Sequence, residues 1–305
     1  MSRSRAVTTG LSGILVVDKP AGWTAHDVVA RVRRLTGERR VGHAGTLDPA
    51  ATGVLPVCVG EATKIVEYLS ASGKTYLAAV LLGAVTETDD LDGWTIAERN
   101  ASSISREMIE ATLPQFTGMI TQIPPAYSAV HVDGQRAYAL ARAGHAINMP
   151  ARTVIVHRLT LVAWEPAVAW LVVDCGAGTY VRALARDLGA ALGCGATLAR
   201  LVRLRSGPFP LCAAWSLDEL NALPDLVAAW QWVAVHPDAV LTDWPALLLD
   251  DAAAWQWANG QTLRGGQSIP DGTLARAYDA QGDWRGVAKR DGDGWRPLKG
   301  IRIAG

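Results

Sequence analysis

The chain has 305 residues, of which half are hydrophobic and 19% are charged, and its formal net charge is zero. This length exceeds one typical small core, so we expect two domains, one large and one small. No uninterrupted apolar stretch reaches the roughly 18 residues of a membrane-spanning helix. The apolar block after the N-terminal MSRSRAVTTG is also too short for a signal peptide, so the sequence indicates a soluble, cytoplasmic globular protein.

Four cysteines stand far apart, at Cys58, Cys175, Cys194 and Cys212. They form no C-x-x-C pair, and only scattered histidines accompany them. The pattern is typical of reduced, mostly buried thiols, so we expect no metal site.

Charge is distributed unevenly along the chain. Residues 1–205 hold 21 Lys and Arg against 17 Asp and Glu, residues 206–263 hold none against 7, and residues 264–305 hold 8 against 5. Two basic regions separated by an acidic one are compatible with an anionic partner such as nucleic acid. Ordinary charge scatter is an alternative interpretation that charge alone does not exclude.

The first third of the chain reads as an α/β pattern. It predicts a strand at 13–18, a helix capped by Thr24 and stopped by Gly37, and a Gly-rich loop at 38–51. A strand at 53–59 and a short helix from Glu61 follow.

In the middle of the chain, alternation over 74–82 predicts a strand that places Tyr76 on the same face as Lys74, Ala78, Val80 and Leu82. We expect a solvated acidic turn at 86–93, since its residues lack the spacing of a calcium loop. A helix at 104–116, a Pro-rich loop at 123–127 and a helical stretch near 136–143 complete this part.

The remaining elements alternate again. Strands are predicted at 153–164, 169–175 and 198–205, with a helix between the last two that Thr179 caps. An S-x-x-E capping box at 216–219 opens the acidic, Trp-rich segment 215–257, for which we have no functional account. Short strands at 274–278, 284–289 and 298–303 suggest a small β-barrel.

The stretch VGHAGTLDPAATGVL at 41–55 holds one carboxylate, Asp48, between tightly turning glycines and a proline. An Asp-Pro turn alone is more often structural than catalytic. The glycines at 176 and 178 imitate a dinucleotide fingerprint, but Val181 occupies the third glycine position.

Several motifs occur in a fixed order along the chain. They are Asp18-Lys19-Pro20-x-Gly22-x-Thr24, Gly45 to Gly53 (G-x-L-D-P-x-A-T-G), Lys74-Thr75-Tyr76, Pro124-Pro125-x-Tyr127-Ser128-Ala129, Gly178-Thr179-Tyr180-x-Arg182 and Leu201-x-Arg203. In these motifs the chain resembles the bacterial tRNA pseudouridine-55 synthases, the TruB family. Ala25, His131 and Thr197 depart from residues that the family often has.

The resemblance implies an α/β fold of α+β type, with a large mixed, mainly antiparallel sheet and a small C-terminal PUA-like β-barrel. We expect the catalytic domain at 1–245, with an RNA-contacting insertion at about 120–150, and the PUA-like domain at 246–305. The implied activity is isomerisation of uridine 55 in the T-loop of tRNA after base flipping. The implied partner is the T-loop and T-stem of tRNA, bound by a monomer without metal, cofactor or membrane.

The resemblance also assigns site residues. Asp48 is the implied catalytic carboxylate, ionised at neutral pH and paired with Arg182. Tyr76 is expected to stack on the target base, where its hydroxyl could help to take the C5 proton. His43 matches the family histidine that enters the vacated loop, and Lys19 would neutralise phosphate or brace Tyr76. Further substrate or RNA contacts are expected from Tyr180, Leu201, Arg203, Tyr127 and Arg136.

Two other functions remain open at this point. A nucleoside or sugar hydrolase would need a second carboxylate to activate water, and it would release free uracil. A non-catalytic RNA-binding or RNA-folding module would use the same fold and basic patches without Asp48. Neither the atom on which Asp48 acts nor the breadth of tRNA substrates follows from the sequence.

Overall fold

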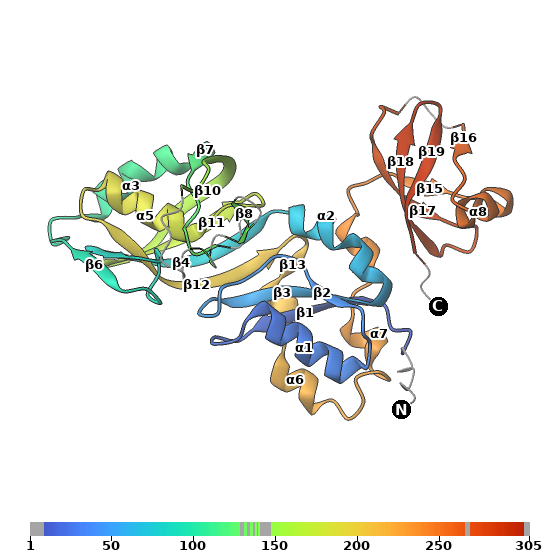
Figure 1. Cartoon of the computed structure of the whole chain (residues 1–305), viewed down its shortest axis with the longest axis horizontal. Coiled ribbons are helices and arrows are strands. Elements are labelled where there is room, and N and C mark those ends of the chain that lie inside the picture. Colours follow the sequence, from blue (N-terminus) through green and yellow to red (C-terminus); the bar gives the residue numbers. More distant parts are fainter. Residues whose placement is uncertain are drawn as a thin grey trace.

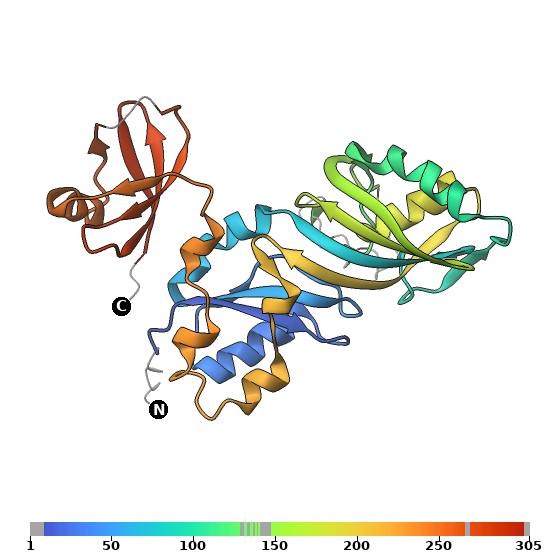
Figure 2. The ribbon, with the colours of Figure 1, turned by 180° about the vertical axis from the view of Figure 1, so that it is seen from behind.

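The computed structural model describes residues 9–128, 131, 132, 135, 136, 138, 140, 148–265 and 269–301. A long curved sheet, with helices packed on it, runs through the centre (Figure 1). A smaller C-terminal unit stands beside one end of this sheet, and the view from behind shows the same separation (Figure 2). Among the helices that these residues form, none is both long and apolar enough to cross a bilayer.

The described residues form a ten-stranded sheet whose main path runs in the order β14, β1, β3, β12, β4, β11, β10, β7. Strand β13 pairs with β12, and β2 pairs with β3. The pairs β1–β14 and β3–β12 are parallel, and the other pairs are antiparallel. The predicted mixed, mainly antiparallel sheet is therefore confirmed. Its strands are β1 (Gly13–Lys19), β2 (Val41–His43), β3 (Thr52–Val59), β4 (Lys74–Leu82), β7 (Gly118–Gln122), β10 (Arg152–Glu165), β11 (Val168–Cys175), β12 (Ala196–Ser206), β13 (Phe209–Pro210) and β14 (Trp215–Ser216).

Helix α1 (Ala25–Thr36) shows why one end of the sheet folds as predicted. Thr24 caps it in a complete capping box with Asp27, and Gly37 ends it in the left-handed conformation, with φ 66°. Its buried valines pack with those of β1 and β3 and with leucines of α6 (Leu217–Ala222), whose Ser216 capping box is also confirmed.

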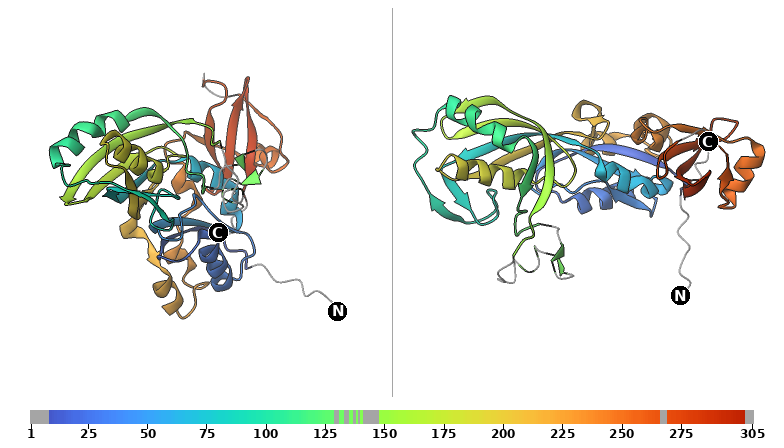
Figure 3. Two further views of the ribbon diagram at one scale, coloured as in Figure 1. Left: turned by 60° about the vertical axis from the view of Figure 1, so that its left-hand side comes forward. Right: turned by 90° about the horizontal axis from the view of Figure 1, so that it is seen from above.

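The other end of the sheet buries its apolar face under α3 (Arg106–Thr112), the 3-10 helix η2 (Leu113–Phe116) and α5 (Val181–Ala191). Figure 1 shows α3 and α5 on this part of the sheet. The short hairpin of β5 (Ala84–Thr86) and β6 (Thr95–Glu98) lies next to β12. A second hairpin, β8 (His131–Val132) with β9 (Gln135–Arg136), projects from the body of the protein (Figure 3).

The C-terminal unit is a five-stranded sheet in the order β15, β17, β18, β19, β16, with one helix, α8 (Asp251–Ala258), against it. This curled sheet fits the predicted PUA-like barrel. Three of its buried residues, Trp284, Val287 and Ile301, share an apolar cluster with the main body, and Lys299 forms an ion pair with Glu67 at 2.7 Å. Its strands are β15 (Ala246–Leu248), β16 (Leu263–Arg264), β17 (Leu274–Tyr278), β18 (Trp284–Asp291) and β19 (Gly294–Gly300).

The connection between the two units consists of short pieces, as does the segment after β3. Tyr68 and Trp244 stack edge to face where these two segments meet, with ring centroids 5.0 Å apart. The pieces are η1 (Gly60–Ile65), α2 (Val66–Ala71), η3 (Leu211–Ala213), α7 (Trp230–Val233) and η4 (Pro237–Val240).

Some local predictions are wrong. The helical stretch expected near 136–143 does not include Arg136, which pairs with His131 in strand β9, whereas Tyr138 and Leu140 are helical. Thr179 does not cap α5, since its hydroxyl bonds to the Gly176 carbonyl and Tyr180 is the N-cap residue. The last strand also begins earlier than predicted, at Gly294.

Candidate active site

Asp48 lies in the loop between β2 and β3 and lines a cleft of about 640 Å³. The loop is a tight turn, in which the Ala51 N–H donates to the Asp48 carbonyl at 3.1 Å. Gly45 adopts φ +94° and Gly53 φ +99°, and a side chain at Gly53 would collide with the backbone of Arg203. These glycines therefore let the loop pass close to β12, which presents Asp48 to the cleft.

Eight residues that the sequence assigns to the site line this one cleft. Asp48 is the one carboxylate among the lining residues that the structure describes. The eight are His43, Asp48, Tyr76, Tyr127, Tyr180, Arg182, Leu201 and Arg203.

Arg182 pairs with Asp48, with Nε 3.0 Å from Oδ2. The guanidinium is only 6% exposed, whereas the carboxylate is 41% exposed. Its other nitrogens contact Asp90 Oδ2 at 3.3 Å and the carbonyls of Thr88 and Tyr127 at 3.1 and 2.9 Å. Arg182 is thus fixed on several sides and offers one edge to Asp48.

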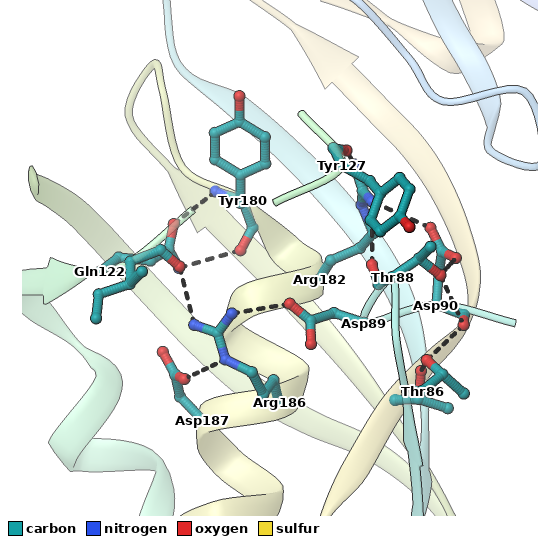
Figure 4. A network of polar contacts seen from close by, with 12 residues as sticks. Thr86, Thr88, Asp89, Asp90, Gln122, Tyr127, Tyr180, Arg182, Arg186 and Asp187 are labelled. Carbon is teal, nitrogen blue, oxygen red and sulfur yellow. Dashed lines mark hydrogen bonds and ion pairs between the residues drawn. The ribbon is translucent and has the colours of Figure 1, made fainter. Parts of the chain in front are cut away.

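The acidic segment 86–93 is not the solvated turn that the sequence predicts. Asp89 and Asp90 are 12% and 16% exposed and pair with two arginines of α5. Figure 4 shows Asp90 toward Arg182 and Asp89 toward Arg186, whose Nη1 lies 2.8 Å from Asp89 Oδ2. Burial of these carboxylates is compensated by the arginines, which lie almost a hundred residues away in the sequence.

Burial and the neighbouring charges shift the pKa of the Asp48 carboxylate in different directions. Desolvation raises its pKa, the adjacent Arg182 lowers it, and Asp90 raises it. The net direction is upward. The sequence predicts only the favourable effect of Arg182, so the burial contribution is a correction from the structure.

Tyr76 lies in the middle of the sheet, beside Arg203 of β12 and Val173 of β11, and its side chain faces the cleft. It is 8% exposed, and burial raises the pKa of its phenol although Arg203 opposes the shift. The hydroxyl therefore stays protonated at neutral pH. The side chain therefore presents an uncharged phenol to the cleft.

Lys19 has no exposed surface, and its ammonium donates to the carbonyls of Pro20, Trp23 and Pro49 at 2.9, 2.6 and 3.1 Å. A phosphate cannot reach it in this conformation. Lys19 instead ties the 20–23 loop to the residue that follows Asp48, which corrects the expected phosphate contact.

Arg203 is also internal, at 1% exposure. It donates to the carbonyls of Val54, Gly45 and Thr46 at 2.6, 3.1 and 3.5 Å. Arg203 therefore braces the loop that carries Asp48. From the same position its positive charge lowers the pKa of Tyr76.

His43 is half-buried on β2 and meets His26 edge to face, with ring centroids 5.6 Å apart. Its Nδ1 is buried and bonds to no other described atom, and burial lowers its pKa. Both rings line the cleft. Arg136 lies in the β8–β9 hairpin, and no contact of its side chain is described.

Sequence reasoning did not select Asp90, Gln122, Arg152 or Lys74 as site residues. Lys74 lines the cleft and donates to the Ser70 and Ser72 carbonyls, both at 2.5 Å. Burial lowers the pKa of Lys74 to about 8. The sequence held a signal for two of them, since Lys74 belongs to the Lys74-Thr75-Tyr76 motif and Gln122 immediately precedes the Pro-rich loop.

Comparison with known proteins identifies the family. The model of the TruB family pseudouridylate synthase N-terminal domain matches residues 33–181, and that of the tRNA pseudouridylate synthase B C-terminal domain matches residues 182–231. A tRNA pseudouridine synthase B of Synechococcus sp. is 46% identical over 282 residues, which cover 90% of this chain and 93% of that protein. The chain belongs to the TruB family of pseudouridylate synthases.

Other TruB family relatives and solved structures agree. A Pseudomonas fluorescens tRNA pseudouridine synthase B is 42% identical over 296 residues, or 96% of each chain. A solved Cbf5–Nop10–Gar1 complex contains a chain that matches with a TM-score of 0.69 and 26% identity, over 91% of this chain and 78% of that one. This TruB family member is therefore a pseudouridine synthase, an isomerase, with the pseudouridine synthase fold.

Proposed function

We propose that this protein converts uridine 55 in the T-loop of tRNA to pseudouridine, with Asp48 as its catalytic carboxylate. The observation that carries the proposal is the Asp48–Arg182 ion pair in the lining of a cleft whose other described lining residues include no carboxylate. The relatives' names support tRNA as the substrate.

The reaction breaks the bond from ribose C1′ to uracil N1, turns the base, and joins C5 to the same carbon. C5 loses a proton and N1 gains one, so nothing is oxidised or hydrolysed. Asp48 acts beside the sugar, as nucleophile or as base, and Arg182 stabilises its ionised form. A glycosidase would require a second carboxylate facing the substrate, whereas Asp90 contacts the far side of Arg182 and does not join the described lining of the cleft.

The uridine has to leave the folded T-loop before it reaches Asp48. Unstacking costs a few kcal/mol, and a ring that fills the vacated place returns about 1–3 kcal/mol. His43 is placed for this at the cleft, and its lowered pKa favours the neutral, stacking form of the ring. Tyr76, which also lines the cleft, then packs against the extruded base.

The domain limits belong to the same proposal. Residues 1–245 would form the catalytic domain and residues 246–305 a PUA-like domain that binds tRNA, in a protein that acts as a monomer in the cytoplasm. The insertion at about 120–150 would contact the RNA, since its first residues lie against α5 and the cleft.

A position-specific assay tests the proposal. The protein is incubated, without added cofactor, with an unmodified tRNA transcript and with a matched transcript that carries C at position 55, and pseudouridine is mapped by carbodiimide labelling and primer extension. One stop at position 55 of the first transcript alone supports the proposal. A stop elsewhere, release of free uracil, or binding without modification would contradict it.

A further inference from the structure

Tyr180 is held from two sides, by an amide that bonds to its backbone and by a guanidinium that lies over its ring. Gln122 of β7 and Arg152 of β10 are directly opposite each other in the antiparallel β7–β10 pair, and both side chains contact Tyr180. The two residues also stand at the two ends of the segment 123–151. One aromatic residue of the cleft is thus connected to both ends of this segment.

Gln122 sets the backbone of Tyr180. Its side-chain amide is fully buried, accepts the Tyr180 N–H at 2.8 Å and donates to the Tyr180 carbonyl at 3.0 Å (Figure 4). Tyr180 is the N-cap of α5, and it makes no side-chain cap of its own. The Gln122 amide therefore fixes the N-cap of the helix, which lies two residues before Arg182.

Arg152 sets the ring of Tyr180. Its guanidinium carbon lies 4.7 Å from the ring centroid, in the geometry of a cation–π contact. Its Nε and Nη2 are buried and bond to nothing else in the described part of the chain. Such a buried, partly unsatisfied charge costs stability, so a purely structural position would favour an apolar side chain.

Two further bonds hold the start of the same segment to α5. Arg186 donates to the Ile123 carbonyl at 2.9 Å, and Arg182 donates to the Tyr127 carbonyl at 2.9 Å. A displacement of the ends of β7 and β10 would therefore move Tyr180 together with the helix that carries Arg182.

We propose that Gln122 and Arg152 are positioning residues that set Tyr180 against the substrate nucleotide in the cleft. This inference rests on the proposed function for its kinetic consequences, but its structural part stands without it. Arg152 and Gln122 act through Tyr180 and do not touch the reacting atoms.

The structural part is tested by ¹⁹F NMR of the full chain labelled with 3-fluorotyrosine, which places a probe on each of the six tyrosines. The Tyr180 resonance is assigned with Tyr180→Phe. We expect it to shift in Arg152→Met and in Gln122→Met, and to stay in place in Arg158→Met, an exposed arginine of the same strand. An unmoved Tyr180 resonance in both variants would overturn the inference, whether or not the wild type modifies tRNA.

The kinetic part is a double-mutant cycle on single-turnover pseudouridine formation. Arg152→Met should lower the rate about three- to tenfold, Arg152→Lys should restore it to within about twofold, and the melting temperature of Arg152→Met should not fall. In a Tyr180→Leu background, Arg152→Met should have almost no further effect. If the fold-changes of the two single variants multiply in the double variant, Arg152 acts independently of Tyr180 and the inference is refuted. An inactive wild type would refute the proposed function alone.

Discussion

Arg182 separates two carboxylates, since its Nε lies 3.0 Å from Asp48 Oδ2 and its Nη1 lies 3.3 Å from Asp90 Oδ2. Only Asp48 opens to the cleft, with 41% of its side chain exposed. The buried guanidinium thus both orients the exposed carboxylate and favours its charge, while the second carboxylate holds the guanidinium.

Replacing Arg182 with Gln should lower kcat at least about 100-fold. The substitution removes the positive charge beside Asp48 and the bond that orients its carboxylate. The pH profile should also change in a defined direction. Arg182 lowers the pKa of Asp48, so its removal raises that pKa, and the acid limb of the rate profile should move to higher pH. Single-turnover rates from pH 5 to 8 measure this, and an unmoved limb would refute the electrostatic role.

Replacing Asp90 with Asn should move the acid limb of the rate profile to lower pH. Asp90 raises the pKa of Asp48, so loss of its charge lowers that pKa, and activity should persist to lower pH. We also expect a fall of about tenfold in kcat, because the Arg182 guanidinium loses one of the two carboxylates that hold it. Single-turnover rates from pH 5 to 8 measure this shift. An acid limb at higher pH than in the wild type would contradict the effect of Asp90 on the pKa of Asp48.

Arg203→Met should lower the free energy of unfolding by about 2–4 kcal/mol, since it leaves three carbonyls of the Asp48 loop and its flank without their donor. Arg205→Met is the matched control on the same strand. Arg205 is 40% exposed in its pair with Asp174, so its loss should cost within about 1 kcal/mol. Urea denaturation compares them, and equal costs would contradict the bracing role of Arg203.

Lys19 should make stability depend on pH above neutrality. Burial lowers its pKa to about 8, whereas a lysine in the unfolded chain titrates near about 10.4. Between these values the unfolded chain binds the additional proton, so this group makes the free energy of unfolding rise with pH. Between pH 7.5 and 9.5 the wild type should gain about 1–2 kcal/mol relative to Lys19→Met. Parallel pH dependences in urea denaturation would contradict the lowered pKa.

Elements with strong local signals were predictable. The Thr24 capping box, the Gly37 stop and the alternation over 74–82 all act within a few residues, and the structure has them where expected. Burial of Asp89 and Asp90 was not predictable in this way, because their partners Arg182 and Arg186 lie on α5, far along the chain. The sequence of an acidic turn does not show whether its carboxylates are hydrated or paired with arginines from a distant element.

Site membership was likewise easier to predict than the role of each residue. Eight of the expected residues line one cleft. Lys19 and Arg203, however, are cationic residues that bond to carbonyls inside the protein, and charge alone does not distinguish such a brace from a phosphate contact. The sequence predicts Thr179 as the cap of α5, but the Thr179 hydroxyl bonds to the Gly176 carbonyl. The start of the helix is held instead by Gln122 of β7, which is distant in the sequence.

The central claim, that Asp48 performs the chemistry, is tested most directly by single-turnover release of tritium from tRNA that carries [5-³H]uridine, with Asp48→Asn and the wild type each in excess over tRNA. The measurement is paired with tRNA binding. We predict that Asp48→Asn binds tRNA with a Kd within about threefold of the wild type but releases tritium at least about 10⁴-fold more slowly. Release within about tenfold of the wild-type rate would show that Asp48 is not the catalytic carboxylate.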